Sequence, residues 1–231
     1  DEYMAEYARS QYAHTQKKAG FDCMRHLEIL AAGAVPLFKD PESIPAQTMT
    51  HYNKELLCKG KQATAEEWRE HFLKYLTAPA MVRYILKTVN IENPDKVLYV
   101  DAALPEYADY LSLGLFFGCK ELFGPNMDVM FEVPYAYDDY PGDLMKLYGR
   151  GFNYAKVLNH DQRSHQDRTD ILQRIVKQEY DLIIFGSFLR GNSPNLLNKF
   201  LSAGFPAQKF AICIGEDQPF STLRNVTGFP E

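Results

Sequence analysis

The sequence lacks the features that mark membrane-spanning, exported and nucleic-acid-binding proteins. No apolar run approaches the ~20 residues that a membrane-spanning helix needs. No basic segment followed by an apolar stretch marks a targeting peptide. The 231 residues carry a net charge of −5, whereas a protein that binds nucleic acid phosphates needs a basic face. We therefore expect a protein without a membrane span in this chain and without a nucleic acid partner.

Cysteine is scarce and scattered. The four cysteines, at positions 23, 58, 119 and 213, form no C-x-x-C pair of the kind that zinc sites and redox motifs use. Three of them stand among apolar neighbours, as buried free thiols do. Free thiols favour a reducing compartment. We therefore expect a cytoplasmic protein with neither a disulfide nor a bound metal.

Short strand-like runs alternate with helical patterns along the chain, of which 46% is hydrophobic. The first part reads as a helix over 1–9, a strand over 11–15, a helix from Asp22, a strand over 35–38 and helices from Thr64 and Pro79. After a polar segment at 90–95, the second part reads as strands over 96–100, 127–131, 180–186 and 209–214, with helices over 107–122, 163–177 and 195–203 between them. Such alternation predicts parallel sheets covered by helices.

The predicted fold is therefore α/β, with two Rossmann-like parallel-sheet units. The first unit, residues 1–92, is partial and ends in a helical segment that joins it to the second unit, residues 93–231. Ligands of such sheets bind beyond the carboxyl ends of the strands. The residues that follow strands of the second unit are thus expected on one rim: Asp101, Gly186, Ser187, Glu216 and Asp217.

The stretch 20–38 holds the most specific chemical pattern. Asp22 is the expected N-cap of its helix, and the expected buried face is Met24, Leu27, Leu30 and Ala31. Arg25 and Glu28 are three residues apart and share a helical face. We expect this pair to bind a ligand, although a weak surface ion pair is the alternative.

The loop before this helix is basic. Lys17 and Lys18 follow the first strand and could meet a diphosphate, while a solvated loop is the alternative. His14 and His26 are possible general bases, and a structural role is the alternative for each.

Residues Arg25, Glu28, Gly33, Val35 and Pro36 resemble the donor-half motif of two-domain (GT-B) glycosyltransferases. The exostosin-like branch is the most similar, with Arg, two residues, Glu, and then Gly-Cys-Ile-Pro-Val; Ala34 stands here in place of Cys. The resemblance implies that Glu28 holds the ribose of a nucleotide sugar. It also implies that Arg25 and the loop lysines approach the phosphates, and that His26 and Gly33 belong to the same site.

The second half is similar in arrangement to domains beside such donor halves in large algal and giant-virus glycosyltransferase-like proteins. The segments that carry this looser likeness are 147–152, 181–187 and 215–217. In GT-B enzymes the acceptor domain precedes the donor domain, whereas here the donor-like half comes first and is short. Because the chain also starts at Asp1 rather than Met, we expect a segment of a longer protein, holding the end of one transferase unit and the start of the next.

The resemblance thus implies a glycosyltransferase, or a fragment of one, that moves a sugar from a nucleotide sugar to a glycan or another hydroxyl acceptor such as a protein. The nucleotide sugar is a substrate, and no cofactor is expected. Without an Asp-x-Asp metal pair the reaction would be metal-independent; Asp138-Asp139 is acidic but lies in an aromatic loop. The alternative is a non-catalytic α/β module whose tyrosine-rich loop, 134–150, binds carbohydrate or protein.

Overall fold

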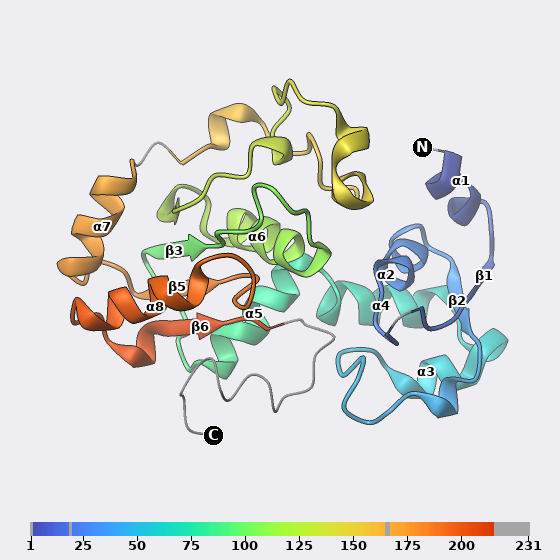
Figure 1. The fold of residues 1–231 in the computed structure, drawn as a ribbon. Helices are drawn as coiled ribbons and strands as arrows, with labels where there is room; N and C mark the ends of the chain where they lie inside the picture. The colour runs from blue at the N-terminus through green and yellow to red at the C-terminus, as the bar shows by residue number, and fades with distance from the viewer. Residues whose placement is uncertain (1, 19, 165–166, 215–231) are drawn as a thin grey trace. The chain divides into compact units, whose positions relative to one another are not determined.

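The computed structural model describes residues 2–18, 20–164 and 167–214, and within them the chain is an α/β protein whose strands pair in parallel. The predicted fold class is confirmed. The chain forms two compact units, of which one reaches to Met81 and the other begins at Val82 (Figure 1). The sequence places its boundary after residue 92, whereas the compact units divide within the helix α5 (Ala78–Thr88).

The first unit is a pair of strands with helices around it. Its elements are α1 (Glu2–Ala8), β1 (Tyr12–Thr15), α2 (Met24–Ala31), β2 (Val35–Phe38), α3 (Lys54–Lys59), α4 (Ala65–Tyr75) and the start of α5. β1 and β2 pair from Tyr12–Val35 to Thr15–Phe38. α2 connects them, as parallel strands require a crossover. Trp68 of α4 is buried in the core beneath β2, together with Leu56 and Leu57 of α3.

Specific residues determine where α2 begins and ends. Gly33 adopts a φ of +86°, and the N–H groups of Gly33 and Ala34 bond back to Leu30 and Ile29. That pattern is a Schellman motif, which turns the chain out of the helix and into β2. At the other end the prediction was wrong, because Cys23 and not Asp22 occupies the N-cap position. The ring of His26 hydrogen-bonds to the carbonyl of Phe21 and fixes the loop that precedes the helix. Asp22 then lies one residue before the N-cap position.

The buried face of α2 also differs from the prediction. His26, Ile29 and Leu30 are its buried residues, whereas Ala31 is exposed. The 3.6-residue period of a helix fits the predicted buried face and the observed one equally well. Because histidine is polar, a hydropathy pattern assigns it to the surface. His26 enters the core because both of its ring nitrogens find hydrogen-bond partners there.

The second unit is a four-stranded parallel sheet. Its elements are β3 (Val97–Val100), α6 (Tyr110–Phe123), β4 (Met127–Val129), α7 (Arg168–Val176), β5 (Leu182–Phe185), α8 (Ser193–Ser202) and β6 (Phe210–Ile212). The strand order is β4-β3-β5-β6, so the chain reverses its direction of progress across the sheet between β3 and β5. α7 and α8 pack on the face that carries Leu98 and Ile183.

Two helices of this unit begin later than their patterns indicated. α6 starts after Asp109 and α7 after Asp167, instead of at residues 107 and 163. In each case the aspartate is the N-cap, and its carboxylate accepts backbone N–H bonds of the first turn, from Ser112 to Asp109 and from Thr169 and Asp170 to Asp167. Capping decides the start here because it satisfies N–H groups that otherwise lack partners.

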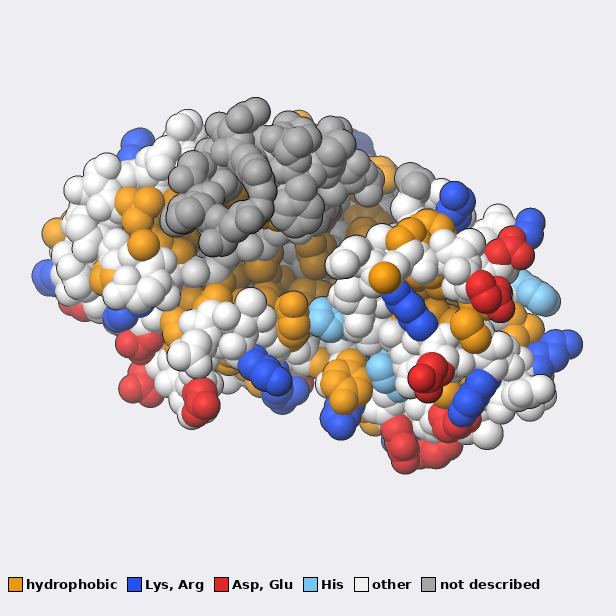
Figure 2. Space-filling view, turned by 90° about the horizontal axis from the view of Figure 1, so that it is seen from below, with side chains coloured by type: hydrophobic (Ala, Val, Ile, Leu, Met, Phe, Trp, Pro, Cys, Tyr) orange, Lys and Arg blue, Asp and Glu red, His pale blue; other side chains and the backbone are white. Residues whose placement is uncertain are grey.

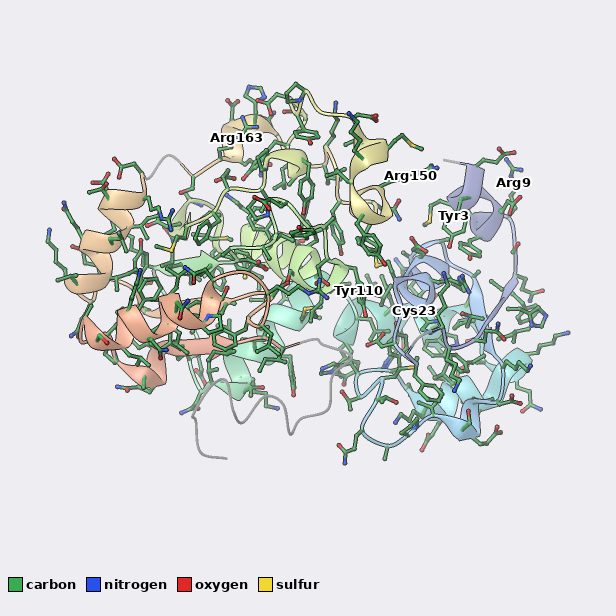
Figure 3. All side chains as sticks on the ribbon, viewed as in Figure 1. Tyr3, Arg9, Cys23, Tyr110, Arg150 and Arg163 are labelled. Atoms are coloured by element: carbon green, nitrogen blue, oxygen red, sulfur yellow. The ribbon has the colours of Figure 1, made fainter. Side chains whose placement is uncertain are left out.

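Hydrogen bonds and ion pairs within the irregular segment from Pro134 to Ser164 stabilise its conformation. Asp138 bonds to the ring of His160 and Asp139 to the guanidinium of Arg163, at the top of Figure 3. These contacts lower the pKa of both aspartates. Tyr135 and Tyr137 of the same segment are buried, so these two rings belong to the core.

Asp101 hydrogen-bonds to the backbone of both loops that follow β3 and β5. Its Oδ1 accepts the N–H groups of Ala103 and Leu104 at 3.1 and 3.0 Å, and its Oδ2 accepts the N–H of Ser187 at 2.7 Å. The side chain is fully buried. A Cβ on Gly186 would clash with this carboxylate, so glycine is required where the loop passes it.

We expect Asp101→Ala to destabilise the protein by about 3 kcal/mol or more, because three backbone N–H groups lose their acceptor inside the protein. Asp101→Asn retains one acceptor oxygen and should cost less. Urea unfolding followed by circular dichroism measures both. Asp161→Ala is the matched control, since that side chain is exposed; an equal midpoint for Asp101→Ala and the control would contradict the anchoring role.

Candidate functional site

A hollow of about 580 Å³ opens at the carboxyl ends of β1 and β2 in the first unit. This is the edge at which parallel sheets bind ligands. Three residues come from the end of β1, three from the end of β2 and one from the first turn of α2. The lining is His14, Thr15, Gln16, Arg25, Leu37, Phe38 and Lys39.

The local folding brings cationic groups to this edge. Because β1 and β2 are parallel, α2 must run back between them, and its amino end lies at the carboxyl ends of both strands. Arg25 is the second residue of α2, and Cys23, labelled in Figure 3, occupies the N-cap position. Among the described residues that line the hollow, none is acidic. The arrangement suits an anion with several acceptor oxygens.

Lys39 is a lining residue that the sequence reasoning missed. Its backbone N–H bonds to the carbonyl of Thr15 at 2.8 Å, which continues the ladder between the two strands and places Lys39 beside the end of β1. The sequence does contain a signal for Lys39, because this residue directly follows the buried end of a strand. The same criterion predicts the rim position of Asp101 in the second unit.

Glu28 lies one turn further along α2 and does not line the hollow. The hydroxyl of Tyr3 projects from α1 and donates to its Oε2 at 2.9 Å (Figure 3). The pKa of Tyr3 is raised, first by burial and then by its hydrogen bonds to Tyr7 and Glu28, so the hydroxyl remains a donor. The carboxylate of Glu28 therefore has a hydrogen-bond donor from α1, three residues along the helix from Arg25.

His26 is buried and has a structural part. Its Nδ1 lies 2.9 Å from the hydroxyl of Thr15, and its Nε2 lies 2.9 Å from the carbonyl of Phe21. These partners fit a neutral ring that donates from Nε2 and accepts at Nδ1. Burial lowers the pKa of His26, which also favours the neutral form. The side chain joins the end of β1 to the start of α2 and does not line the hollow.

His14, the other candidate general base, lines the hollow, whereas the remaining predicted donor-site residues of the first unit do not. Lys17 and Lys18 are exposed on the loop after β1, and the ammonium of Lys17 lies 5.2 Å from the ring centre of Phe21. Gly33 ends α2 and so lies at the opposite end of that helix from Arg25. Of the predicted donor-site residues, Arg25 alone is in the lining.

In the second unit Asp101, Gly186 and Ser187 do meet on one rim, beside the reversal point between β3 and β5. The hydroxyl of Ser187 also contacts that of Ser112, at the start of α6. The carboxylate of Asp101 is taken up by three backbone N–H groups, so it acts here as an anchor. Glu216 and Asp217 lie outside the described residues.

Comparison with models of protein families, with characterised proteins and with solved structures gives no match for this chain. None of the helices in the described ranges combines the length and apolar character needed to cross a membrane. Over the same part of the chain, no three His, Cys, Asp or Glu side chains gather so that they could hold a metal ion. Acidic and basic side chains are interspersed on the face seen in Figure 2.

We expect His26→Ala to destabilise the first unit by about 2–4 kcal/mol, since it opens a cavity and leaves the Thr15 hydroxyl and the Phe21 carbonyl without their partner. Trp68 is the single tryptophan and is buried in this unit, so its fluorescence during urea unfolding measures the change. His14→Ala is the control, because His14 is exposed, and should change stability by less than about 0.5 kcal/mol.

The same measurement has a pH dependence. The folded pKa of His26 is lowered, so the unfolded chain takes up the proton first. The stability of the wild type should therefore fall as pH drops below about 6.5, and His26→Ala should lack that component. Parallel pH profiles for the two proteins would refute the neutral buried ring.

Proposed function

We propose that the hollow at the carboxyl ends of β1 and β2 binds the diphosphate of a nucleotide sugar, and that the protein is a metal-independent glycosyltransferase or a part of one. The observation that carries this proposal is the convergence of Arg25, Lys39 and the amino end of α2 on a hollow without acidic lining residues. The likeness of residues 25–36 to the donor-half motif supports it.

The chemistry of the lining suits a diphosphate. A guanidinium binds two phosphate oxygens at once, and the ammonium of Lys39 adds a second positive charge. The amino end of α2 lies at the same edge, and the helix dipole there favours negative charge. In glycosyl transfer the bond from the sugar to the diphosphate breaks, so these groups would stabilise the departing nucleoside diphosphate. The hollow, at about 580 Å³, is in the size range of small-molecule sites.

Glu28 would bind the ribose in this proposal. It follows Arg25 by three residues, which is a rise of about 4.5 Å along the helix. A ribose lies directly beside the diphosphate in a nucleotide, so one helical face can serve both groups. Tyr3 fixes the carboxylate of Glu28 through its 2.9 Å hydrogen bond, and a fixed acceptor binds a sugar hydroxyl at a lower entropic cost.

Nucleoside diphosphates test the proposal directly. We expect uridine or guanosine diphosphate to bind in calorimetric titration without added metal, and Arg25→Gln and Lys39→Gln each to weaken binding by about tenfold or more. Glu28→Gln should weaken binding of the nucleotide but not of inorganic pyrophosphate, which has no ribose. Arg69→Gln, on the exposed surface of α4, is the matched control. Absence of binding, or equal binding by Arg25→Gln and the control, would refute the donor site.

A second candidate function rests on exposed aromatic rings in the second unit. Tyr148 is 75% exposed and packs edge-on against Phe152, which in turn packs against Tyr110. Tyr110 and Arg150 of this region are labelled in Figure 3. Gly149, Arg150 and Phe152 all have positive φ, and such a strained turn is typical of functional loops. An exposed ring of this kind can stack on a sugar, which fits a non-catalytic carbohydrate-binding module.

Oligosaccharide titration separates this candidate from the first. A carbohydrate-binding module should bind neutral oligosaccharides without any nucleotide, and Tyr148→Ala should weaken that binding by about tenfold. Tyr84→Ala serves as the control, since Tyr84 is exposed on another helix. Saccharide binding that Tyr148→Ala leaves unchanged would exclude this surface.

A further inference from the structure

His14 is a titratable residue in the lining of the hollow of the first unit, and the proposed function gives it no part so far. It is the third residue of β1 and is exposed. Within the described part of the chain its ring makes no hydrogen bond to a protein group, so both ring nitrogens are open to a ligand. The ring of His26, by contrast, uses both of its nitrogens for structural contacts.

The alternation of side chains along β1 places His14 on the side of the sheet that faces away from α2. Successive residues of a strand point to opposite faces. The hydroxyl of Thr15 contacts the ring of His26 on α2, so Thr15 faces that helix and His14 faces the other way. Arg25 enters the lining from α2 itself. A ligand at the strand ends would therefore have Arg25 on one side and His14 on the other.

The charged groups around His14 are mostly cations. Arg25 from the first turn of α2 and Lys39 after β2 share its hollow. Lys61 lies near the start of β1, where its ammonium is 5.9 Å from the centre of a tyrosine ring. Asp40 follows Lys39 but is exposed and does not line the hollow. A bound anion would thus be the acidic partner of the His14 ring, and its charge would favour the protonated imidazolium.

We propose that His14 is a phosphate-binding residue of this hollow and takes up a proton from solvent when a nucleotide sugar binds. This inference rests on the proposed function and adds a control of the same site by pH. Histidine is the side chain that ordinarily changes its charge between about pH 5 and 8. Once protonated, both ring nitrogens donate, and a charge-assisted hydrogen bond to a phosphate oxygen is stronger than a neutral one. Donor binding therefore strengthens as the pH falls.

The probe is uridine diphosphate glucose, because each of its two phosphates has only a strongly acidic proton and the charge of the ligand stays constant near neutral pH. We expect the wild type to bind it about threefold more tightly at about pH 6 than at about pH 8, in calorimetric titration without added metal. His14→Gln should match the wild type at the higher pH and bind about threefold more weakly at the lower. Arg25→Gln removes a permanent charge and should weaken binding at both.

Proton uptake is measured directly by titrating the wild type at about pH 7 in two buffers whose enthalpies of ionisation differ. The difference between the two binding enthalpies gives the number of protons taken up with the ligand. We expect a fraction of a proton for the wild type and close to none for His14→Gln. His160→Gln is the matched control, since His160 is an exposed histidine of the second unit, and it should take up as much as the wild type.

The outcomes separate this inference from the proposed function. Binding of the nucleotide sugar without proton uptake, or equal uptake by the wild type and His14→Gln, would overturn the part given to His14 and leave the donor site standing. An equal loss of affinity by His14→Gln at both pH values would also overturn it, because a neutral or structural contact has no such pH dependence. Absence of binding at either pH would overturn both. Circular dichroism at the two pH values verifies that each variant is folded.

Discussion

Parallel strand pairing is the constraint on which both units depend. Two parallel strands cannot be joined by a hairpin, so a helix must return the chain, and its amino end then lies beside the carboxyl ends of the strands. In the first unit this requirement brings Arg25 of α2 to the ends of β1 and β2. In the second unit it gathers Asp101 and Ser187 at the reversal point between β3 and β5. The proposed donor site is thus a consequence of strand direction.

Buried polar side chains then fix the loops at these edges. His26 joins the end of β1 to the loop before α2, and Asp101 joins the loops after β3 and β5. In a sequence, a histidine or an aspartate is a natural candidate for a catalytic or ligand-binding residue. In the folded chain their polar atoms are occupied by backbone groups or by a neighbouring hydroxyl, so they shape the edge at which a ligand would bind.

The two units differ in how charge is balanced. The hollow in the first unit is open and gathers positive groups without acidic lining residues, which suits a multiply charged anion. In the second unit, acidic and basic side chains pair with one another, as Arg174 does with Asp128 and Arg163 with Asp139. The electrostatics of the hollow in the first unit therefore carry the proposed function.

The sequence by itself determined the α/β class, because apolar periodicity and the punctuation by Gly, Pro and polar segments are local properties. It also singled out Arg25, which lines the hollow of the first unit, and it placed Asp101 and Ser187 on one rim through the rule for parallel strands. It missed Lys39 and the burial of His26. Only the tertiary structure decided these points, because whether a polar side chain faces a hollow or a hydrogen-bond partner depends on residues distant in the chain, such as Thr15 for both Lys39 and His26.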